Sequence, residues 1–419
     1  MTPALSSRER RALIGVVLLS VIVRVAVRLA CHGQAVETFE HEDIAQHLLE
    51  GRGFGLESYG GAWYRTFGSP PFAYLCAAVY ALTGHSHAAM LGVQWLFSAV
   101  TVAACYLLGR RLFSARAGLA AALLTACHPG FVFYDTQKIN ALSLDAMLAV
   151  LGIASVFALK VGRSLKTAVA TGVVHGLALF ERSTQVALAP LAALSLWQSR
   201  RAGGFVRRAA VYGIAILAVM GPWIVRNLLL YHRPVLVTTT SADVFWRGNN
   251  PLASGGAYAN GRPGVSVFEA SPPEFQRQMV GKGELAQSDI FRREGMAYVR
   301  SHPREALKLY ALKLKIFWWF APATGFLYPP AYLTVYKVYY GFLLGLAALG
   351  LWAAVQASTA QQRQEQAMLA GFLLSVSLVQ AAFYVEIRHR WGVEPLLLLW
   401  SAAGGVALCE AAGRRLRTR

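Results

Sequence analysis

The chain has 419 residues, of which 56% are hydrophobic and 15% are charged, and its mean hydropathy is +0.43. This composition excludes an ordinary soluble domain, because apolar runs close to the ~20 residues that cross a bilayer recur along the chain. The formal net charge of +19 does not indicate nucleic-acid binding, because the Lys and Arg residues cluster between apolar runs, where the positive-inside rule places them.

The first apolar run, residues 13–31, follows a basic stretch and lacks the small-residue cleavage site of a signal peptide, so we expect a retained helix. Beyond it, Glu40, Glu42 and Asp43 place three carboxylates within four positions, ahead of apolar residues at helical spacing. This pattern predicts a short amphipathic helix on the membrane surface, with its acids at the N-terminal end and Gly51 as its stop. The apolar positions of this helix are Ile44, Ala45, Leu48 and Leu49.

Nine further apolar runs predict about ten transmembrane helices in all, with a short apolar helix opening at Pro70-Pro71 before the second span. Between the seventh span and the eighth, residues 226–328 are polar, rich in Gly and Pro, and too long for a simple connector. After the first, the expected spans cover about residues 88–108, 117–134 (interrupted at His128-Pro129), 139–159, 168–180, 185–197, a run ending at Pro222, 329–354, 367–385 and 391–409.

Basic residues alternate along this succession of spans. The clusters lie at the N-terminus and in residues 109–116, 160–166, 200–208 and 413–419. Ten spans with both ends inside put all five clusters on one side, the cytoplasm. The acidic first loop, Asp135, Glu181-Arg182, residues 226–328 and Arg388-His389-Arg390 then share the extracytoplasmic side.

The three carboxylates of the first loop are either solvated interfacial charge or the source of a general base for a bound hydroxyl. A metal site could draw on His41, His47 and these acids, but no recognised ligand spacing appears, so neither a metal nor another cofactor is predicted.

Several other outer groups could bind a phosphate or a sugar. A guanidinium suits phosphate because its planar fork bonds two oxygens at once, yet Glu181-Arg182 could equally be a local ion pair that closes a turn. Likewise, Asp135 and Lys138 could pair with one another, and Asp145, inside a span, could be structural or functional. The candidate substrate-binding residues are Arg182, Arg226, Asp135, Lys138, Asn249, Asn250, Arg388 and Arg390.

Taken together, stretches spread over nearly the whole chain resemble the GT-C glycosyltransferases, specifically bacterial members grouped with the dolichyl-phosphate-mannose–protein mannosyltransferases (glycosyltransferase family 39). They run in the family's order. The matching stretches are Phe39-Glu40, Ile44-Ala45, residues 48–54, Ser69-Pro70-Pro71, residues 106–113, residues 222–227, Gly248-Asn249-Asn250, Arg388-His389-Arg390 and Val393-Glu394-Pro395.

The resemblance implies a polyprenyl-phosphate-linked sugar as donor and an active site on the extracytoplasmic side. The family's first-loop catalytic acid falls best on Glu40, with Glu42 or Asp43 able to take that role. Arg182 matches an arginine in the corresponding outer turn of relatives, and Asp135 is the residue nearest to a second family acid. Inversion at the sugar carbon is expected by the same analogy.

We therefore predict an all-α polytopic membrane protein of the GT-C type with an amphipathic, interfacial first outer loop. Its expected parts are an N-terminal transmembrane module (1–225) with a catalytic first outer loop (32–70), an extracytoplasmic loop region with an interfacial helix (226–328), and C-terminal transmembrane helices (329–419).

The predicted function is an integral-membrane glycosyltransferase of the inner (plasma) membrane that moves a sugar from a polyprenyl-phosphate donor to a hydroxyl of protein, lipid or glycan. Its expected partners are that donor, the acceptor and the bilayer. Because the donor is already activated, no nucleotide site is needed, and no P-loop or GxGxxG appears. The alternative is a membrane transporter or lipid flippase, although no internal repeat is visible; a non-catalytic scaffold for envelope assembly is a third class.

Overall fold

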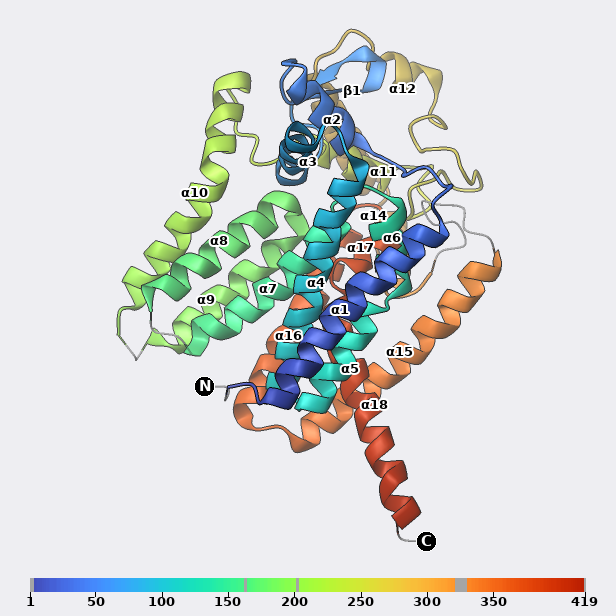
Figure 1. The fold of residues 1–419 in the computed structure, drawn as a ribbon. Coiled ribbons are helices and arrows are strands. Elements are labelled where there is room, and N and C mark those ends of the chain that lie inside the picture. The colour runs from blue at the N-terminus through green and yellow to red at the C-terminus, as the bar shows by residue number, and fades with distance from the viewer. Residues whose placement is uncertain (1–3, 162–163, 201–202, 321–329, 418–419) are drawn as a thin grey trace.

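The computed structural model describes residues 4–161, 164–200, 203–320 and 330–417. Within them the chain is a helical bundle capped at one end by short helices and loops (Figure 1). Parts of the predicted basic clusters, Arg163, Arg201 and residues 418–419, lie outside the described residues, as do residues 321–328 of the predicted polar region.

The bundle is built from helices that coincide with the predicted apolar runs. These are α1 (Ser7–Ala30), α4 (His87–Leu112), α5 (Ala115–Ala126), α6 (Pro129–Gln137), α7 (Leu142–Val161), α8 (Leu165–Glu181), α9 (Leu188–Gln198), α10 (Phe205–Tyr231), α15 (Pro330–Ala357), α16 (Ala360–Ala381) and α18 (Glu394–Arg417).

The cap contains shorter elements, many of them in the two polar regions of the sequence. Its helices are α2 (Glu40–Leu49), α3 (Pro70–Thr83), α11 (Ser241–Arg247), α12 (Pro273–Arg277), α13 (Glu284–Ser301), α14 (Pro303–Trp318) and α17 (Ile387–Trp391), with 3-10 turns at Tyr59–Gly61 and Ser183–Ala187. Strands β1 (Leu56–Glu57) and β2 (Trp63–Tyr64) pair antiparallel, with Leu56 opposite Tyr64 and Glu57 opposite Trp63.

Among the described residues, six helices are long and apolar enough to cross a membrane, and α5 with α6 makes a seventh if the bent pair is one span. The bend of 42° falls at the predicted interruption, where His128 caps α6 and Pro129 occupies its first turn. Helices α8 and α9, with 17 and 11 residues, are shorter than the ~20 residues of a straight span. The predicted all-α polytopic membrane fold is confirmed, but three of the ten expected spans, those at α8, α9 and the 22-residue α16, are not among the described helices that pass this test.

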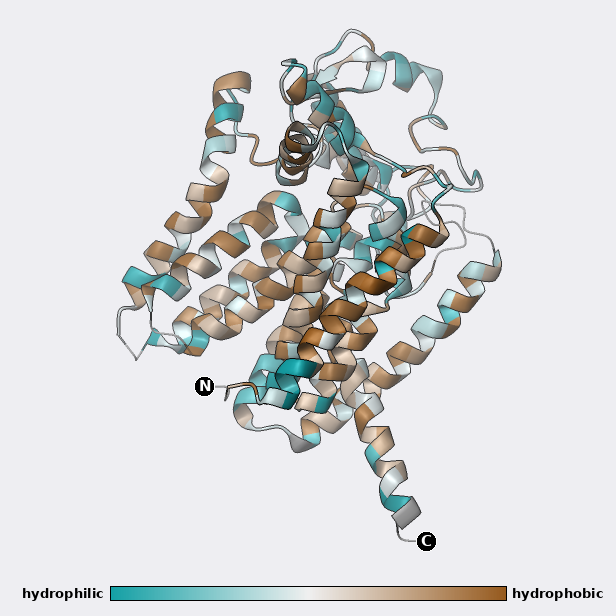
Figure 2. Cartoon of the chain, viewed as in Figure 1, coloured by the Kyte–Doolittle hydropathy of each residue, from teal (hydrophilic) through white to brown (hydrophobic). Residues whose placement is uncertain are grey.

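The basic turn at residues 109–116 lies at the end of the bundle where α1 begins and α18 ends. Arg110 pairs with Glu9 at 2.7 Å, Arg111 with Glu365 at 2.6 Å, and Arg116 with Glu410 at 3.3 Å. These ion pairs join the ends of α1, α4, α5, α16 and α18. Figure 1 shows α2, α3 and α12 at the opposite end, and Figure 2 shows the apolar colour concentrated along the bundle between the two ends.

Helix α2 forms where the amphipathic pattern predicts it. Ile44 and Ala45 are fully buried, and Ala45 packs in the same core cluster as Phe72 of α3. The helix ends at Leu49 with Glu50 as its C-cap, followed by Gly51 in the left-handed conformation (φ 76°), as the stop signal predicts. Leu49, expected on the apolar face, is instead exposed.

Helices α15 and α18 pack with their backbones almost in contact. A Cβ added at Gly350 would lie 1.9 Å from the carbonyl oxygen of Trp400, and one added at Gly404 would lie 2.0 Å from that of Leu346. Such small residues allow close helix approach inside a membrane, where packing rather than hydrophobic burial drives association.

Candidate active site

A cavity of about 300 Å³ lies where α2, α7, α17 and the α8–α9 turn converge. Segments far apart in the sequence contribute to its wall, including residues 237–244 and the C-terminal end of α16. The titratable side chains that line it are Glu40, His41, Tyr134, Asp145, Glu181, Arg182, Tyr384, Arg388 and His389.

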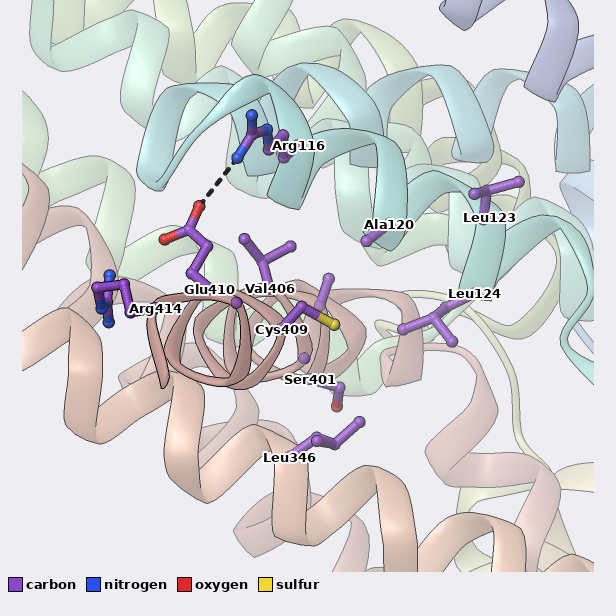
Figure 3. Close-up of a pocket in the computed structure, with 13 residues that line it drawn as sticks. Arg116, Ala120, Leu123, Leu124, Leu346, Ser401, Val406, Cys409, Glu410 and Arg414 are labelled. Carbon is purple, nitrogen blue, oxygen red and sulfur yellow. Dashed lines mark hydrogen bonds and ion pairs between the residues drawn. The ribbon is translucent and has the colours of Figure 1, made fainter. Parts of the chain in front are cut away.

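A larger cavity of about 790 Å³ opens between α5, α15 and α18, at the end of the bundle that carries the termini (Figure 3). Its wall is mainly apolar, with Leu123, Leu124 and Leu346 among the lining side chains. Arg116 of α5 pairs with Glu410 of α18 at 3.3 Å at its rim, and Arg414 also lines it. The smaller cavity gathers the carboxylates, guanidinium groups and imidazoles named above, so it is the candidate site.

Glu40 is the first residue of α2, and its carboxylate opens into the smaller cavity. The side chain is 38% exposed, and the nearest basic group among the described residues is His41, whose Nδ1 is 4.0 Å from Glu40 Oε1. Gly68 faces it without a side chain: a Cβ there would lie 3.8 Å from Glu40 Cγ. The carboxylate therefore has room to meet a small molecule.

Arg182 and Asp145 form an ion pair in the same wall. Arg182 Nε and Nη2 each lie 2.5 Å from Asp145 Oδ2; the Asp145 side chain is buried, and that of Arg182 is 29% exposed. The local pair between Arg182 and Glu181 is therefore not formed. Glu181 instead accepts hydrogen bonds from the Ser69 hydroxyl at 2.6 Å and the Phe72 amide at 3.1 Å, which anchors the start of α3.

Helix α17 supplies a second basic patch to the cavity. Arg388 Nε pairs with Glu386 Oε2 at 2.5 Å, and the Glu386 amide donates a hydrogen bond to His389 Nδ1 at 3.2 Å. Burial lowers the pKa of His389 well below its usual value, and the nearby charges of Arg182 and Arg388 lower it further. The Glu386 amide donates to Nδ1, so His389 presents its Nε2 as the ring nitrogen free of this hydrogen bond.

The other two acids of the first loop are placed differently. Glu42 is buried and accepts hydrogen bonds from Tyr80 at 2.6 Å, while His85 and His87 approach it from the α3–α4 turn. Asp43 is exposed on α2. In the described part of the chain, Glu40 is the one acid of the three that lines the cavity.

Asp135 and Lys138 do not pair with one another. Asp135 pairs with Arg24 of α1 at 2.7 Å, and the Ser98 hydroxyl donates to the same oxygen at 2.5 Å. Lys138 pairs with Glu37. The interpretation as a mutual pair was wrong because both partners come from the first 40 residues, which spacing along the sequence does not reveal.

Arg226 lies outside the cavity wall, over aromatic rings. Its guanidinium carbon is 4.4 Å from the Trp223 ring centroid and 5.9 Å from that of Phe54, and it donates a hydrogen bond to Asn227 at 2.8 Å. This is the geometry of an interfacial anchor.

Asn249, Asn250 and Arg390 also have protein partners. The side-chain amides of the two asparagines donate to backbone carbonyls at 2.7–2.8 Å. Arg390 is buried, pairs with Glu394 at 3.0 Å and lies 3.7 Å from the Tyr340 ring centroid. None of the three lines the cavity within the described residues.

Sequence reasoning did not select several residues that line the cavity. Asp145 was the one with a usable signal, because an ionisable residue inside an apolar run is costly and faces protein or a cavity. Glu181 and His389 were visible only as neighbours of selected arginines. Others of this group include Tyr134, Thr238, Thr240 and Tyr384.

Comparisons with known proteins support the predicted resemblance. Residues 68–225 match the family model described as dolichyl-phosphate-mannose-protein mannosyltransferase. A search of curated proteins finds no match.

Among solved structures, the apo oligosaccharyltransferase of Archaeoglobus fulgidus has a TM-score of 0.58 at 14% identity, over 98% of this chain and 52% of that one. The same archaeal enzyme, AglB, in complex with an inhibitory peptide and a dolichol-phosphate has a TM-score of 0.55 at 12% identity, again over 98% and 52%. ArnT from Cupriavidus metallidurans, bound to undecaprenyl phosphate, has a TM-score of 0.42 at 16% identity, over 94% and 78%.

The chain thus spans about half the length of the archaeal oligosaccharyltransferase whose fold it shares. The resemblance to GT-C membrane glycosyltransferases is confirmed by the family match and by this fold.

Proposed function

We propose that this chain is an integral-membrane glycosyltransferase that moves a sugar from a polyprenyl-phosphate-linked donor to a hydroxyl acceptor. The observation that carries the proposal is the cavity in which an open carboxylate, Glu40, shares a wall with the guanidinium groups of Arg182 and Arg388. The match to the mannosyltransferase family supports the reaction class, and a fold shared with an enzyme solved with dolichol-phosphate supports the donor class.

In the proposed reaction Glu40 acts as general base. It takes the proton of the acceptor hydroxyl while the hydroxyl oxygen forms a bond to the anomeric carbon of the donor. The bond from that carbon to the phosphate oxygen breaks, and its electron pair leaves on the lipid phosphate. A single displacement of this kind inverts the configuration of the sugar carbon.

Arg182 and Arg388 would stabilise the charge that develops on the departing phosphate. Asp145 forms an ion pair with Arg182 and Glu386 forms one with Arg388, each with a nitrogen–oxygen distance of 2.5 Å. Guanidinium groups oriented in advance cost little reorganisation when the charge develops, so we assign positioning roles to these two acids.

The proposed topology puts this cavity on the extracytoplasmic face of the plasma membrane, with both termini in the cytoplasm. Its support is the basic turn at residues 109–116, which pairs with the start of α1 and the end of α18 at the other end of the bundle. Residues 1–225, with the first outer loop at 32–70, would form the catalytic module, and the polar region 226–328 and helices from 329 onward would complete the cavity wall.

The test is transfer of radiolabelled sugar from polyprenyl-phosphate donors, mannose first, by full-length protein in liposomes. Glu40→Gln is nearly isosteric but cannot accept the proton, so turnover should fall by about 10²–10⁴-fold while donor binding is retained. Glu50→Gln is the matched control, since Glu50 is the C-cap of the same helix and forms an exposed pair with Arg52. Normal turnover in Glu40→Gln would remove this residue from the chemistry. Movement of intact donor across the bilayer without transfer, by wild-type protein, would favour the flippase alternative.

A further inference from the structure

Two histidines and a glutamate meet outside the cavity, where α2 contacts the turn between α3 and α4. Glu42 Oε1 lies 3.0 Å from His85 Nε2 and 2.7 Å from His87 Nε2. The three candidate ligand atoms all lie within 4.8 Å of one another. In the described part of the chain, none of the three residues belongs to the cavity wall that contains Glu40.

We propose that Glu42, His85 and His87 form a binding site for a zinc ion. Two imidazole nitrogens and one carboxylate oxygen are a donor set that zinc takes, with a water molecule in the fourth position. Sites for calcium or magnesium are built from oxygen ligands instead. The side chains of His85 and His87 are 38% and 36% exposed, so an ion and its water can reach them from solvent.

Neighbouring groups prepare this site. The Tyr80 hydroxyl donates to Glu42 Oε2 at 2.6 Å, which fixes the carboxylate and leaves Oε1 for the ion. The Tyr80 ring also stacks on the His85 imidazole, with ring centroids 4.4 Å apart and an angle of 13° between the planes. His85 itself has φ of 64°, a left-handed conformation that non-glycine residues seldom adopt. The turn holds this backbone conformation with the imidazole directed at Glu42.

The ion would connect Glu42 on α2 to His85 and His87, which follow it in the sequence by 43 and 45 positions. Residues two positions apart on an α-helix point about 200° away from one another, so Glu42 and Glu40 occupy opposite faces of α2. Zinc bound to Glu42 would therefore hold one face of α2, while Glu40 points into the cavity from the opposite face. We assign the site a positioning role: it fixes α2 on the α3–α4 turn.

The site is tested by measuring zinc binding to the full chain without any sugar donor. The protein is purified without a histidine tag and stripped of metal with a chelator. Wild-type protein should bind one zinc ion per chain with high affinity, measured by competition with a chromophoric chelator. His85→Asn keeps a residue type that tolerates the left-handed backbone, and His87→Gln keeps side-chain volume. Each should weaken binding by at least about 10²-fold, because loss of even an outer-shell partner costs about 10–100-fold.

His32→Asn is the control, since His32 is exposed beyond α1 and contacts only the Leu29 carbonyl in the described structure. It should bind zinc as the wild type does. Zinc should also raise the Tm of the wild type and of His32→Asn, but not that of the two site variants. Equal zinc affinity in all four proteins, or no zinc uptake by the wild type, would overturn the site.

X-ray absorption of the wild-type zinc complex provides a readout that needs no variant to fold. Two imidazoles with oxygen ligands support the site, whereas sulfur ligands or fewer than two imidazoles would refute it. Because binding is measured without substrate, its outcome is independent of whether Glu40 acts in sugar transfer.

Discussion

Arg182 places two guanidinium nitrogens on a single oxygen of Asp145 while part of the side chain remains open to the cavity. A guanidinium has five N–H donors, so the pair with Asp145 leaves other N–H groups of Arg182 available to bind a ligand. The contrast with Arg390 is informative, because Arg390 is buried against Glu394 and the Tyr340 ring. At the scale of single residues, an arginine suits phosphate binding when it is held firmly on one side and accessible on the other.

Arg182→Ala should weaken binding of a polyprenyl-phosphate, since it removes a charge-assisted hydrogen bond worth about 1.5–3 kcal/mol. That corresponds to a rise in Kd of about 10- to 100-fold. Arg182→Lys should recover only part of the loss, because an ammonium lacks the bidentate fork. The measurement is titration of lipid phosphate into folded protein in detergent.

Arg233→Ala is the control for this series, since Arg233 forms an exposed pair with Asp289 outside the cavity wall. Because Arg182→Ala also leaves Asp145 buried without its partner, its fold should be checked by circular dichroism before titration. Wild-type affinity in a folded Arg182→Ala variant would show that this arginine only supports the fold.

Residue types and spacing predicted Glu40, Arg182 and Arg388 as site residues, and all three line the cavity; their roles stay predictions. The same reasoning could not separate Glu40 from Glu42, two positions away. What separates them is the set of partners on Glu42, which come from Tyr80 and the α3–α4 turn. Such partners are fixed by tertiary packing, so a list of charges along the chain does not contain them.

At the scale of elements, local signals were sufficient for α2, α3 and the break between α5 and α6. Amphipathic spacing, a glycine stop and a proline in the first turn act within one or two helical turns, so they can be read from a short stretch. The close contact between α15 and α18 is different. It depends on Gly350 and Gly404 meeting across 54 positions, which apolar periodicity does not predict.

Gly404→Ala tests that contact. The added methyl would fall 2.0 Å from the Leu346 carbonyl oxygen, a backbone atom, so the two helices must separate. Overpacking of this kind typically destabilises by about 1–3 kcal/mol, which thermal unfolding in detergent should register as a lower Tm. Gly371→Ala is the control: no atom of the described residues lies within 4 Å of the added Cβ there, and alanine favours a helix. A Tm unchanged in both variants would mean that the close approach contributes nothing to stability.

At the scale of the whole molecule, the alternation of basic clusters predicted that they share one end of the bundle. The ion pairs of Arg110, Arg111 and Arg116 join helix ends at that end. The count of spans was less predictable, since α8 and α9 are too short for straight crossings and are separated by a 3-10 turn. A window of hydropathy measures apolar length, not whether a helix crosses the bilayer or stops inside the protein.

Cysteine labelling tests the topology. In a variant without the five native cysteines, Ser301→Cys on α13 should react with a membrane-impermeant maleimide on intact cells. Arg207→Cys at the start of α10 should react only after permeabilisation, because it belongs to a basic cluster expected in the cytoplasm. Both positions are exposed in the structure. Labelling of Arg207→Cys on intact cells, with Ser301→Cys protected, would invert the orientation.

The pair of Arg24 and Asp135 has a consequence for how the protein is made. The two side chains are 1% exposed and 111 positions apart, so α1 leaves the ribosome well before its counter-charge on α6. At about 5–20 residues per second, the delay is on the order of 5–20 s. During that time a guanidinium near the centre of a newly inserted helix costs about 2.5–3.5 kcal/mol on insertion scales. Until α6 is inserted, the guanidinium must contact lipid headgroups by snorkelling or stay with the insertion machinery. Helix α1 is therefore synthesised first but reaches its final packed position late.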